Sequence, residues 1–347
     1  MLLCLTAIAT GIALRQIDRA WFARGRPHAA DAAQLIALQR ARANNWTPAL
    51  LLVGQWIQIT GWWLLAAHGP LAAAAAAAGV AVHFRHLQEI SHFAIHGVLA
   101  RTPRANLLLA EVFAHRPLGL APATVRRTRH VRDHHPNATV TGVDPNLEEL
   151  HQAGLRPGAA RRQAAIAFIH PLTWRGIRTT AAGIAANVGH APGRVAALAA
   201  VLAAAYLVGG WPAVICSVLV PRLLLYPQLA HLSLLVEHTW FDPQPRTGTR
   251  AWVEAGRCLR LYPHNHALAH LAAITWLPYG DLHHYAHSAH PSLRWNCLRA
   301  LERHLNEPHF TPTALLLGTN SVAHRHLNAL TPAGQPNQWQ QASNARA

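Results

Sequence analysis

Hydrophobic residues along the chain gather into four long runs, which polar, histidine-rich segments separate. Residues 48–67 and 71–91 form one pair of runs, and residues 194–210 and 212–236 form the other. The first run has about the length of a helix that crosses a bilayer. The second is long enough only if its helix continues past the apolar residues toward His92. This pattern predicts two helical hairpins and therefore four transmembrane helices.

The apolar runs and the segments that flank them divide the chain into three predicted parts. Residues 1–45 begin with an apolar stretch that is too short to span, lacks a basic start, and leads into an arginine-rich amphipathic stretch, so we expect an interfacial or cytosolic segment and no signal peptide. Residues 46–318 form the membrane domain. Residues 319–347 end in a stretch rich in Gln, Asn and Ala, which predicts a disordered tail.

Composition and charge support an integral membrane protein. Only 13% of the residues are charged, about half the share usual in soluble domains. The net charge of +16 comes from arginines that lie between the apolar runs, and both hairpin turns lack arginine. This distribution favours retention of arginine on one side of a membrane over nucleic-acid binding. We therefore expect a protein of the bacterial inner membrane, with both termini and the histidine-rich segments in the cytoplasm.

Histidine is the most informative residue type, since the 26 histidines outnumber the 14 acidic residues. The segment 129–135 holds His130, His134 and His135; in an α-helix the first two share a face and the third lies about 100° further round. His92 and His96 are four residues apart, and a third group lies at residues 284–287. The groups at residues 92–96 and 284–287 each lie just outside an apolar stretch. A metal site beside the membrane is the predicted chemistry.

The number of histidines indicates two metal ions. Imidazole binds iron, copper, zinc and nickel, so the ligand type alone does not name the metal. Eight or more clustered histidines exceed the three or four protein ligands that one zinc ion takes. The four cysteines are far apart and form no C-x-x-C pair, so they predict neither a disulfide framework nor a zinc ribbon. A cytosolic helical cap that holds a polyhistidine dimetal site, in an all-α membrane protein, is the expected architecture.

The order and spacing of these histidines resemble the membrane fatty acid desaturase and hydroxylase superfamily, most of all the bacterial fatty acid desaturases. His92-x-x-x-His96 is similar to the first histidine box of that family, and His130-x-x-x-His134-His135, followed by Asp144-Pro145, is similar to the second. Glu237-His238-Thr239 looks like the segment that supplies a further ligand, and His284-x-x-His287 looks like the third box. The resemblance covers about residues 46–305 and rests on the boxes in order with the two hairpins between them.

The third box departs from the family pattern, because it normally ends in two adjacent histidines and Ser288 follows His287 here. His290 is three residues further on, so in a continued helix it would lie on the same side as His287 and could fill the vacancy. His283 is the other residue that could replace the missing histidine. The alternative is that neither histidine replaces it, so that one metal ion is weakly held and activity is lost or altered. With His290 in place of the missing histidine, the resemblance implies these metal ligands: His92, His96, His130, His134, His135, His238, His284, His287 and His290. His283 is the possible substitute for His290.

The resemblance also implies an activity: a diiron enzyme that uses O2 as co-substrate to introduce a double bond into an acyl chain, with no catalytic residues beyond the metal ligands. The substrate would be an acyl lipid, an acyl-CoA or an acyl-carrier protein, and the electron donor a ferredoxin, a rubredoxin or a cytochrome b5-type protein. Hydroxylation of an alkane, fatty acyl chain or other lipid is the alternative within the family. A metal- or haem-binding membrane protein without enzymatic activity, such as a transporter or electron carrier, is the alternative outside it.

Other polar residues near the boxes have more ordinary expected roles. Glu89 lies three residues before His92 and could accept a hydrogen bond from its ring. His83 and His86 are expected to line the helix that leads to the first box. The remaining C-terminal histidines are expected at the surface: His304, His309, His324 and His326.

Overall fold

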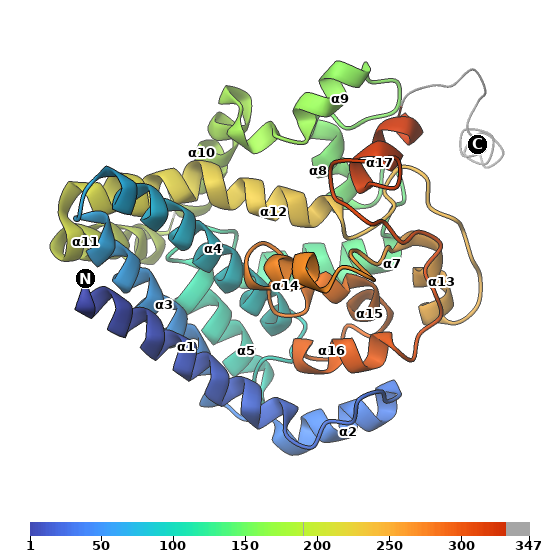
Figure 1. The fold of residues 1–347 in the computed structure, drawn as a ribbon, viewed down its shortest axis with the longest axis horizontal. Helices are drawn as coiled ribbons and strands as arrows, with labels where there is room; N and C mark the ends of the chain where they lie inside the picture. The colour runs from blue at the N-terminus through green and yellow to red at the C-terminus, as the bar shows by residue number, and fades with distance from the viewer. Residues whose placement is uncertain (190, 331–347) are drawn as a thin grey trace.

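Helices form the regular structure of the protein, and the computed structural model describes residues 1–189 and 191–330 (Figure 1). The expected all-α class is confirmed. The longer helices are α1 (Leu2–Ala23), α2 (Ala32–Arg42), α3 (Thr47–Ala66), α4 (Pro70–Ile95), α10 (Trp174–Val188), α11 (Pro192–Val214) and α12 (Tyr226–Leu235). The shorter ones are α5 (Pro103–Ala110), α6 (Ala123–Arg127), α7 (His135–Asn137), α8 (Pro145–Ala153), α9 (Arg161–Ala167), α13 (Arg250–Arg257), α14 (His266–Ile274), α15 (His284–Ala289), α16 (Trp295–Glu302) and α17 (Val322–Leu330).

Both predicted hairpins are present as chain reversals. Between α3 and α4, Gly69 has a φ of 108° and Pro70 begins the next helix. The second reversal is at Gly210, whose φ of 64° and ψ of −159° interrupt α11. Only glycine adopts such a conformation readily, and Pro212 follows at the start of the returning segment.

Two helical stretches of the described chain are long and apolar enough to cross a membrane, Thr47–Ala66 and Pro192–Leu235. The second of these contains the reversal at Gly210 and continues through two π-helical segments, η4 (Ile215–Leu219) and η5 (Pro221–Leu225), into α12. Only 28% of its most apolar window is buried inside the molecule. Large apolar side chains such as Leu207 and Trp211 therefore remain exposed on it.

Helix α1 packs lengthwise along α3, in the opposite direction. A Cβ atom placed on Gly61 would lie 3.0 Å from the Cys4 carbonyl oxygen, and one on Gly54 would lie 3.1 Å from the Gly11 carbonyl oxygen, so the two backbones touch. At 22 residues, α1 is about as long as α3. The boundary expected between the apolar and the arginine-rich stretch of residues 1–45 is not a helix end, because α1 continues through it to Ala23 and α2 forms from the rest of the arginine-rich stretch.

The N-terminus lies at the end of the molecule that is remote from the predicted metal ligands. The Met1 amino group is 3.5 Å from His68 Nε2, beside the α3–α4 reversal, whereas His92 lies at the far end of the 26-residue helix α4. In Figure 1 the N-terminus is at the left and α13, α15 and α16 are at the right. The prediction that both termini share a side with the histidines is therefore wrong for the N-terminus.

The C-terminal part of α1 is fixed to the segment after the third histidine group. Asp18 and Arg294 form a buried ion pair, with 2.9 Å between Oδ1 and Nη2. The Arg294 guanidinium also lies between the rings of Phe22 and Trp295, 3.6 and 3.8 Å from their centroids. These contacts tie the N-terminal helix to α16, next to the candidate site.

The predicted tail from residue 319 contains a helix. Residues Val322–Leu330 form α17, in which Val322, Ala323, His326 and Leu330 are buried. Ala323 and Leu330 pack in one cluster with Leu147 and Leu150 of α8, whereas Val322 packs in another. The prediction of disorder is wrong for residues 322–330, because amphipathic spacing outweighs the polar composition of the segment. Residues 331–347 lie outside the described residues.

Candidate metal centre

The first histidine pair lies on the last turn of α4. His92 and His96 are four residues apart on one face of the helix, and their Nε2 atoms are 3.2 Å apart. The other ring nitrogen of His92, Nδ1, lies 2.7 Å from Glu89 Oε1, so the carboxylate accepts a hydrogen bond from it. The expectation for Glu89 is confirmed, and it directs His92 Nε2 toward the neighbouring imidazoles.

The second histidine group lies on a π-helical segment, η2 (Thr128–His134), which leads into α7. The His135 amide donates to the His130 carbonyl, an i to i+5 bond that brings these two residues one turn apart. His134 projects to a different side, where its Nδ1 is 2.8 Å from Asp144 Oδ1. His134 and His135 are adjacent in the chain, yet their side chains belong to two different clusters.

The third group comes from the short helix α15. His284 and His287 are both buried, and His287 has no hydrogen-bond partner on either ring nitrogen among the described residues. His238 lies in an extended segment after α12, where the Thr239 amide donates to the Arg257 carbonyl at 2.8 Å. A short bridge with Cys258 therefore fixes the position of His238.

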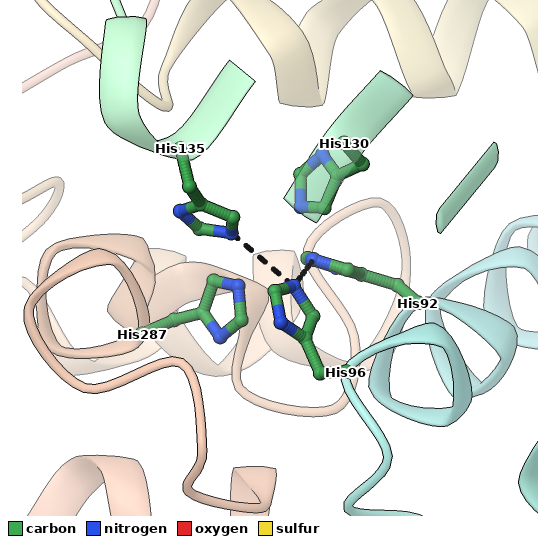
Figure 2. Close-up of side chains that lie close together, drawn as sticks. All are labelled: His92, His96, His130, His135 and His287. Carbon is green, nitrogen blue, oxygen red and sulfur yellow. Dashed lines mark hydrogen bonds between the residues drawn. The ribbon is translucent and has the colours of Figure 1, made fainter. Parts of the chain in front are cut away.

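The structure brings these residues together in two adjacent clusters. The ligand atoms of the first lie within 4.8 Å of one another, and Figure 2 shows their rings facing a common centre; its members are His92, His96, His130, His135 and His287. His135 Nε2 is 3.2 Å from His96 Nε2. The ligand atoms of the second cluster also lie within 4.8 Å of one another; its members are His134, Glu237, His238 and His284. His238 and His284 face each other there with 3.3 Å between their Nε2 atoms.

A further network of polar groups orients the ligands from behind. Glu89 accepts a hydrogen bond from Arg85 at 2.9 Å, and Arg85 also contacts Asp281 at 2.5 Å. Asp281 in turn accepts a bond from Ser233 at 2.6 Å. This buried network connects α4, α12 and the segment before α15. Such outer contacts fix the ring orientation and the tautomer of metal-binding histidines.

Burial keeps the imidazoles in the neutral form that binds metals. Desolvation, and then the neighbouring imidazoles, lower the pKa of His130, His135 and His287 well below 6.5. The pKa values of His238 and His284 are lowered for the same reasons. Burial, helped by the nearby Asp281 carboxylate, raises the pKa of Glu237 well above 4.5.

The donor set fits a pair of metal ions. Several buried ring nitrogens have no hydrogen-bond partner in the described part of the chain, among them His130 Nε2 and His134 Nε2. An unpartnered buried nitrogen costs free energy, which a metal bond would offset. The Nε2 atoms that face one another are at distances expected for ligands of one ion, since Zn–N or similar bonds are about 2.1 Å long.

The two substitutes considered for the third box do not reach either cluster. His290 is half-buried and has an extended backbone with φ −139° and ψ 72°, because Pro291 follows it and α15 ends at Ala289. His283 lies before that helix, where its Nδ1 is 2.6 Å from Glu302 Oε2. The structure therefore brings together eight of the predicted histidines and leaves His290 and His283 outside.

Several residues of the site region were not identified from the sequence as site residues. Glu237 was noted only as the neighbour of His238, and Asp144 only as part of a motif. Cys258 Sγ lies 3.4 Å from His238 Nδ1 and 3.5 Å from Glu254 Oε2, so these two residues lie behind His238. The sequence offers no signal for them, because they are 16 and 20 residues away from His238 and match no ligand spacing.

An open cavity of about 370 Å³ adjoins the first cluster. Its lining includes His135, Val131, Arg250, Arg257 and Pro291. Arg250 Nε donates to the Ser288 carbonyl at 2.9 Å, which links this wall to α15. Glu254 also lines the cavity and pairs with Arg257 at 2.6 Å, so Arg250 is the cation of the lining that has no carboxylate partner among the described residues.

Comparison with protein-family models and with curated proteins finds no match to this chain. The histidine clusters and the all-helical fold therefore carry the functional argument. Together they define a histidine-rich helical protein with two adjacent histidine clusters that could each hold a metal ion. A third possible group, formed by His238, Glu254 and Cys258, shares His238 with the second cluster.

Proposed function

We propose that the protein is an O2-dependent diiron enzyme of the membrane that introduces a double bond into an acyl chain. The observation that carries this proposal is the pair of adjacent buried histidine clusters at one end of an apolar helical bundle. A centre this rich in imidazole suits iron. The sequence order of its histidines, which resembles the membrane fatty acid desaturases, selects the reaction class.

In this proposal each cluster holds one iron ion. His92, His96, His130, His135 and His287 form the first site, and His134, His238 and His284 contribute to the second. A diiron centre with O2 supplies the oxidising power to remove hydrogen from an unactivated C–H bond. The protein positions the acyl chain and excludes water, and Glu89 and Asp144 hold their histidines in the ligating tautomer.

The membrane arrangement is part of the proposal. Spans at about residues 48–67, 71–91, 194–210 and 212–236 would put the exposed apolar surface of Pro192–Leu235 against lipid. The histidine end then lies at the cytoplasmic face, where acyl chains enter from the bilayer. Helices α9 and α10 support this placement, because Ile166 of α9 and Trp174 of α10 are exposed, the latter beside Arg175 and Arg178.

The proposed partners follow from charge and chemistry. The substrate would be an acyl lipid, an acyl-CoA or an acyl-carrier protein. Arg250 lines the cavity beside the first cluster, and the chain carries a net charge of +16, so an acidic electron carrier of the ferredoxin, rubredoxin or cytochrome b5 type would be attracted to the protein.

Metal content and product analysis test the proposal. Detergent-purified protein should hold about two iron ions per chain, the number that the histidine count favours, and His134→Ala should lose iron. Incubation with an acyl-lipid panel, a reductant system and O2 should give alkenes. Hydroxylated products without any alkene would reassign the protein to lipid hydroxylation, and a Soret band without non-haem iron would reassign it to haem binding.

A further inference from the structure

The two clusters differ in their ligands. The first contains five histidines, whereas the second contains three histidines and one carboxylate. The missing imidazole is at position 288, one turn after His284 on α15. Ser288 is buried, and its Oγ is 3.5 Å from His284 Nε2, so this position faces the second cluster. A neutral serine hydroxyl is not among the usual ligands of such a centre.

Glu237 belongs to the segment after α12 and comes immediately before His238 in the chain. One of its carboxylate oxygens lies within 4.8 Å of the ligand nitrogens of His134, His238 and His284. The segment that fixes His238 therefore also fixes Glu237. Since α12 ends at Leu235, both side chains leave the helix and turn toward the centre.

One oxygen of the Glu237 carboxylate has no partner among the described residues, whereas the neighbouring buried carboxylates are paired. Its Oε2 is buried and has no hydrogen-bond partner in the described part of the chain. Glu89 and Asp281 both pair with Arg85, and Glu254 pairs with Arg257 at 2.6 Å. A buried carboxylate oxygen without a proton donor is costly, and a dication beside it would remove that cost.

We propose that Glu237 is a ligand of the second metal ion and fills the vacancy that Ser288 leaves in the third histidine box. This inference rests on the proposed diiron centre and makes it asymmetric: one ion is held by imidazoles alone, and the other by imidazoles and a carboxylate. A carboxylate brings one negative charge to a site that neutral histidines leave doubly positive. It therefore stabilises the more oxidised state of the second ion.

The test compares four purified, iron-reconstituted proteins with wild type: Glu237→Gln, Ser288→His, the double variant, and Glu302→Gln. The last is the matched control, because Glu302 is a buried carboxylate that contacts His283 outside both clusters. Iron per chain is measured by mass spectrometry, and the coordination of each iron by Mössbauer spectroscopy of the reduced protein. Neither measurement depends on activity.

Glu237→Gln should lower iron content from about two ions per chain to about one, with loss of one of two distinct ferrous doublets. Ser288→His should restore the second ion in the double variant by supplying the missing imidazole, and Glu302→Gln should keep both. Gln is isosteric with Glu, so the metal-free variant should melt no lower than metal-free wild type.

Full iron content in Glu237→Gln, with both doublets unchanged, would overturn the inference and leave the diiron proposal intact. Wild-type protein that holds no iron after reconstitution would overturn both. The iron content of the wild-type protein therefore separates the two failures: iron is present if only the Glu237 inference fails and absent if the diiron proposal fails.

Discussion

At the scale of single residues, the hydrogen bond between His134 and Asp144 fixes the orientation of one predicted ligand of the second cluster. Both side chains are fully buried, and Asp144 Oδ1 accepts from His134 Nδ1 at 2.8 Å. Asp144→Asn should keep the cap of α8, where Oδ1 also accepts from the Asn146 amide. It should weaken metal binding about 10- to 100-fold, because an amide fixes the ring less firmly than a carboxylate does. Competition with a chelator of known affinity measures this; unchanged affinity would contradict it.

His287 and His290 form a matched pair of neighbouring histidines. The His287 ring centroid lies 4.6 Å from those of His92 and His96, whereas His290 is half-buried and outside both clusters. His287→Ala should therefore lose the iron of the first site, and His290→Ala should retain it. Iron content per chain measures both variants. Loss of iron in His290→Ala would mean that residues 290–291 rearrange when metal binds.

His326 gives a pH dependence that is separate from the metal centre. Its Nε2 donates to the Leu235 carbonyl at 2.9 Å, and burial lowers its pKa from 6.5 to about 4. Below pH 6.5 this histidine is protonated in the unfolded chain but stays neutral in the folded chain, so the free energy of unfolding falls as the pH decreases through 6.5. Between pH 7 and pH 5 the free energy of unfolding falls by about 2 kcal/mol. His326→Gln should lack this loss in chemical denaturation. The same dependence of the free energy of unfolding on pH in both proteins would refute the assignment.

The expected surface position of His326 is wrong, because its ring is fully buried.

At the scale of helices, the contact between α1 and α3 depends on glycine. A Cβ atom on Gly11 would lie 2.3 Å from the Gly54 carbonyl oxygen, so Gly11→Ala must push the helices apart. Overpacking of this kind costs about 1–3 kcal/mol. Gly183→Ala in α10 is the control, since a Cβ there meets no atom within 4 Å and should stabilise the helix. Melting temperatures in detergent measure the difference; equal values would show that α1 is held only at its Asp18 end.

The elements that sequence could predict are those with a strong periodic or apolar pattern. The apolar runs gave α3, α4 and the reversal at Gly210, and the i, i+4 spacing gave the His92–His96 pair on one face. The same spacing rule suggested an α-helix for residues 130–135, but the segment is π-helical. Three histidines in six residues satisfy either geometry, and only the tertiary contacts select one.

The parts of the site that the sequence did not reveal depend on long-range contacts or on local breaks in helices. Pro291 ends α15 before His290, which removes this residue from the helical register on which its predicted role depended. Glu237 reaches the second cluster because α12 ends two residues before it. Neither position follows from composition, since both depend on where a helix stops and which element it then meets.

At the scale of the whole molecule, the clusters connect segments that are far apart in the chain. The first joins the end of α4, the π-helical segment η2 and α15, while the second adds the segment after α12. The hydrophobic core follows α3, α4 and α11 and also reaches this end through Phe93, Ala286 and Leu298, but none of its members is a metal ligand. Metal should therefore stabilise the histidine end of the molecule more than the helical hairpins.

Removal of metal tests this division. For each site, a free metal concentration 100 times the dissociation constant contributes about 2.7 kcal/mol to stability. Dialysis against a strong iron chelator should lower the melting temperature, and hydrogen exchange should increase at residues 130–137 and 284–289. Exchange in α1 and α3 should stay unchanged, because their contact does not include a ligand, and His290→Ala serves as the metal-retaining control. Faster exchange throughout the long helices would instead mean that the bundle and the histidine end unfold as one cooperative unit.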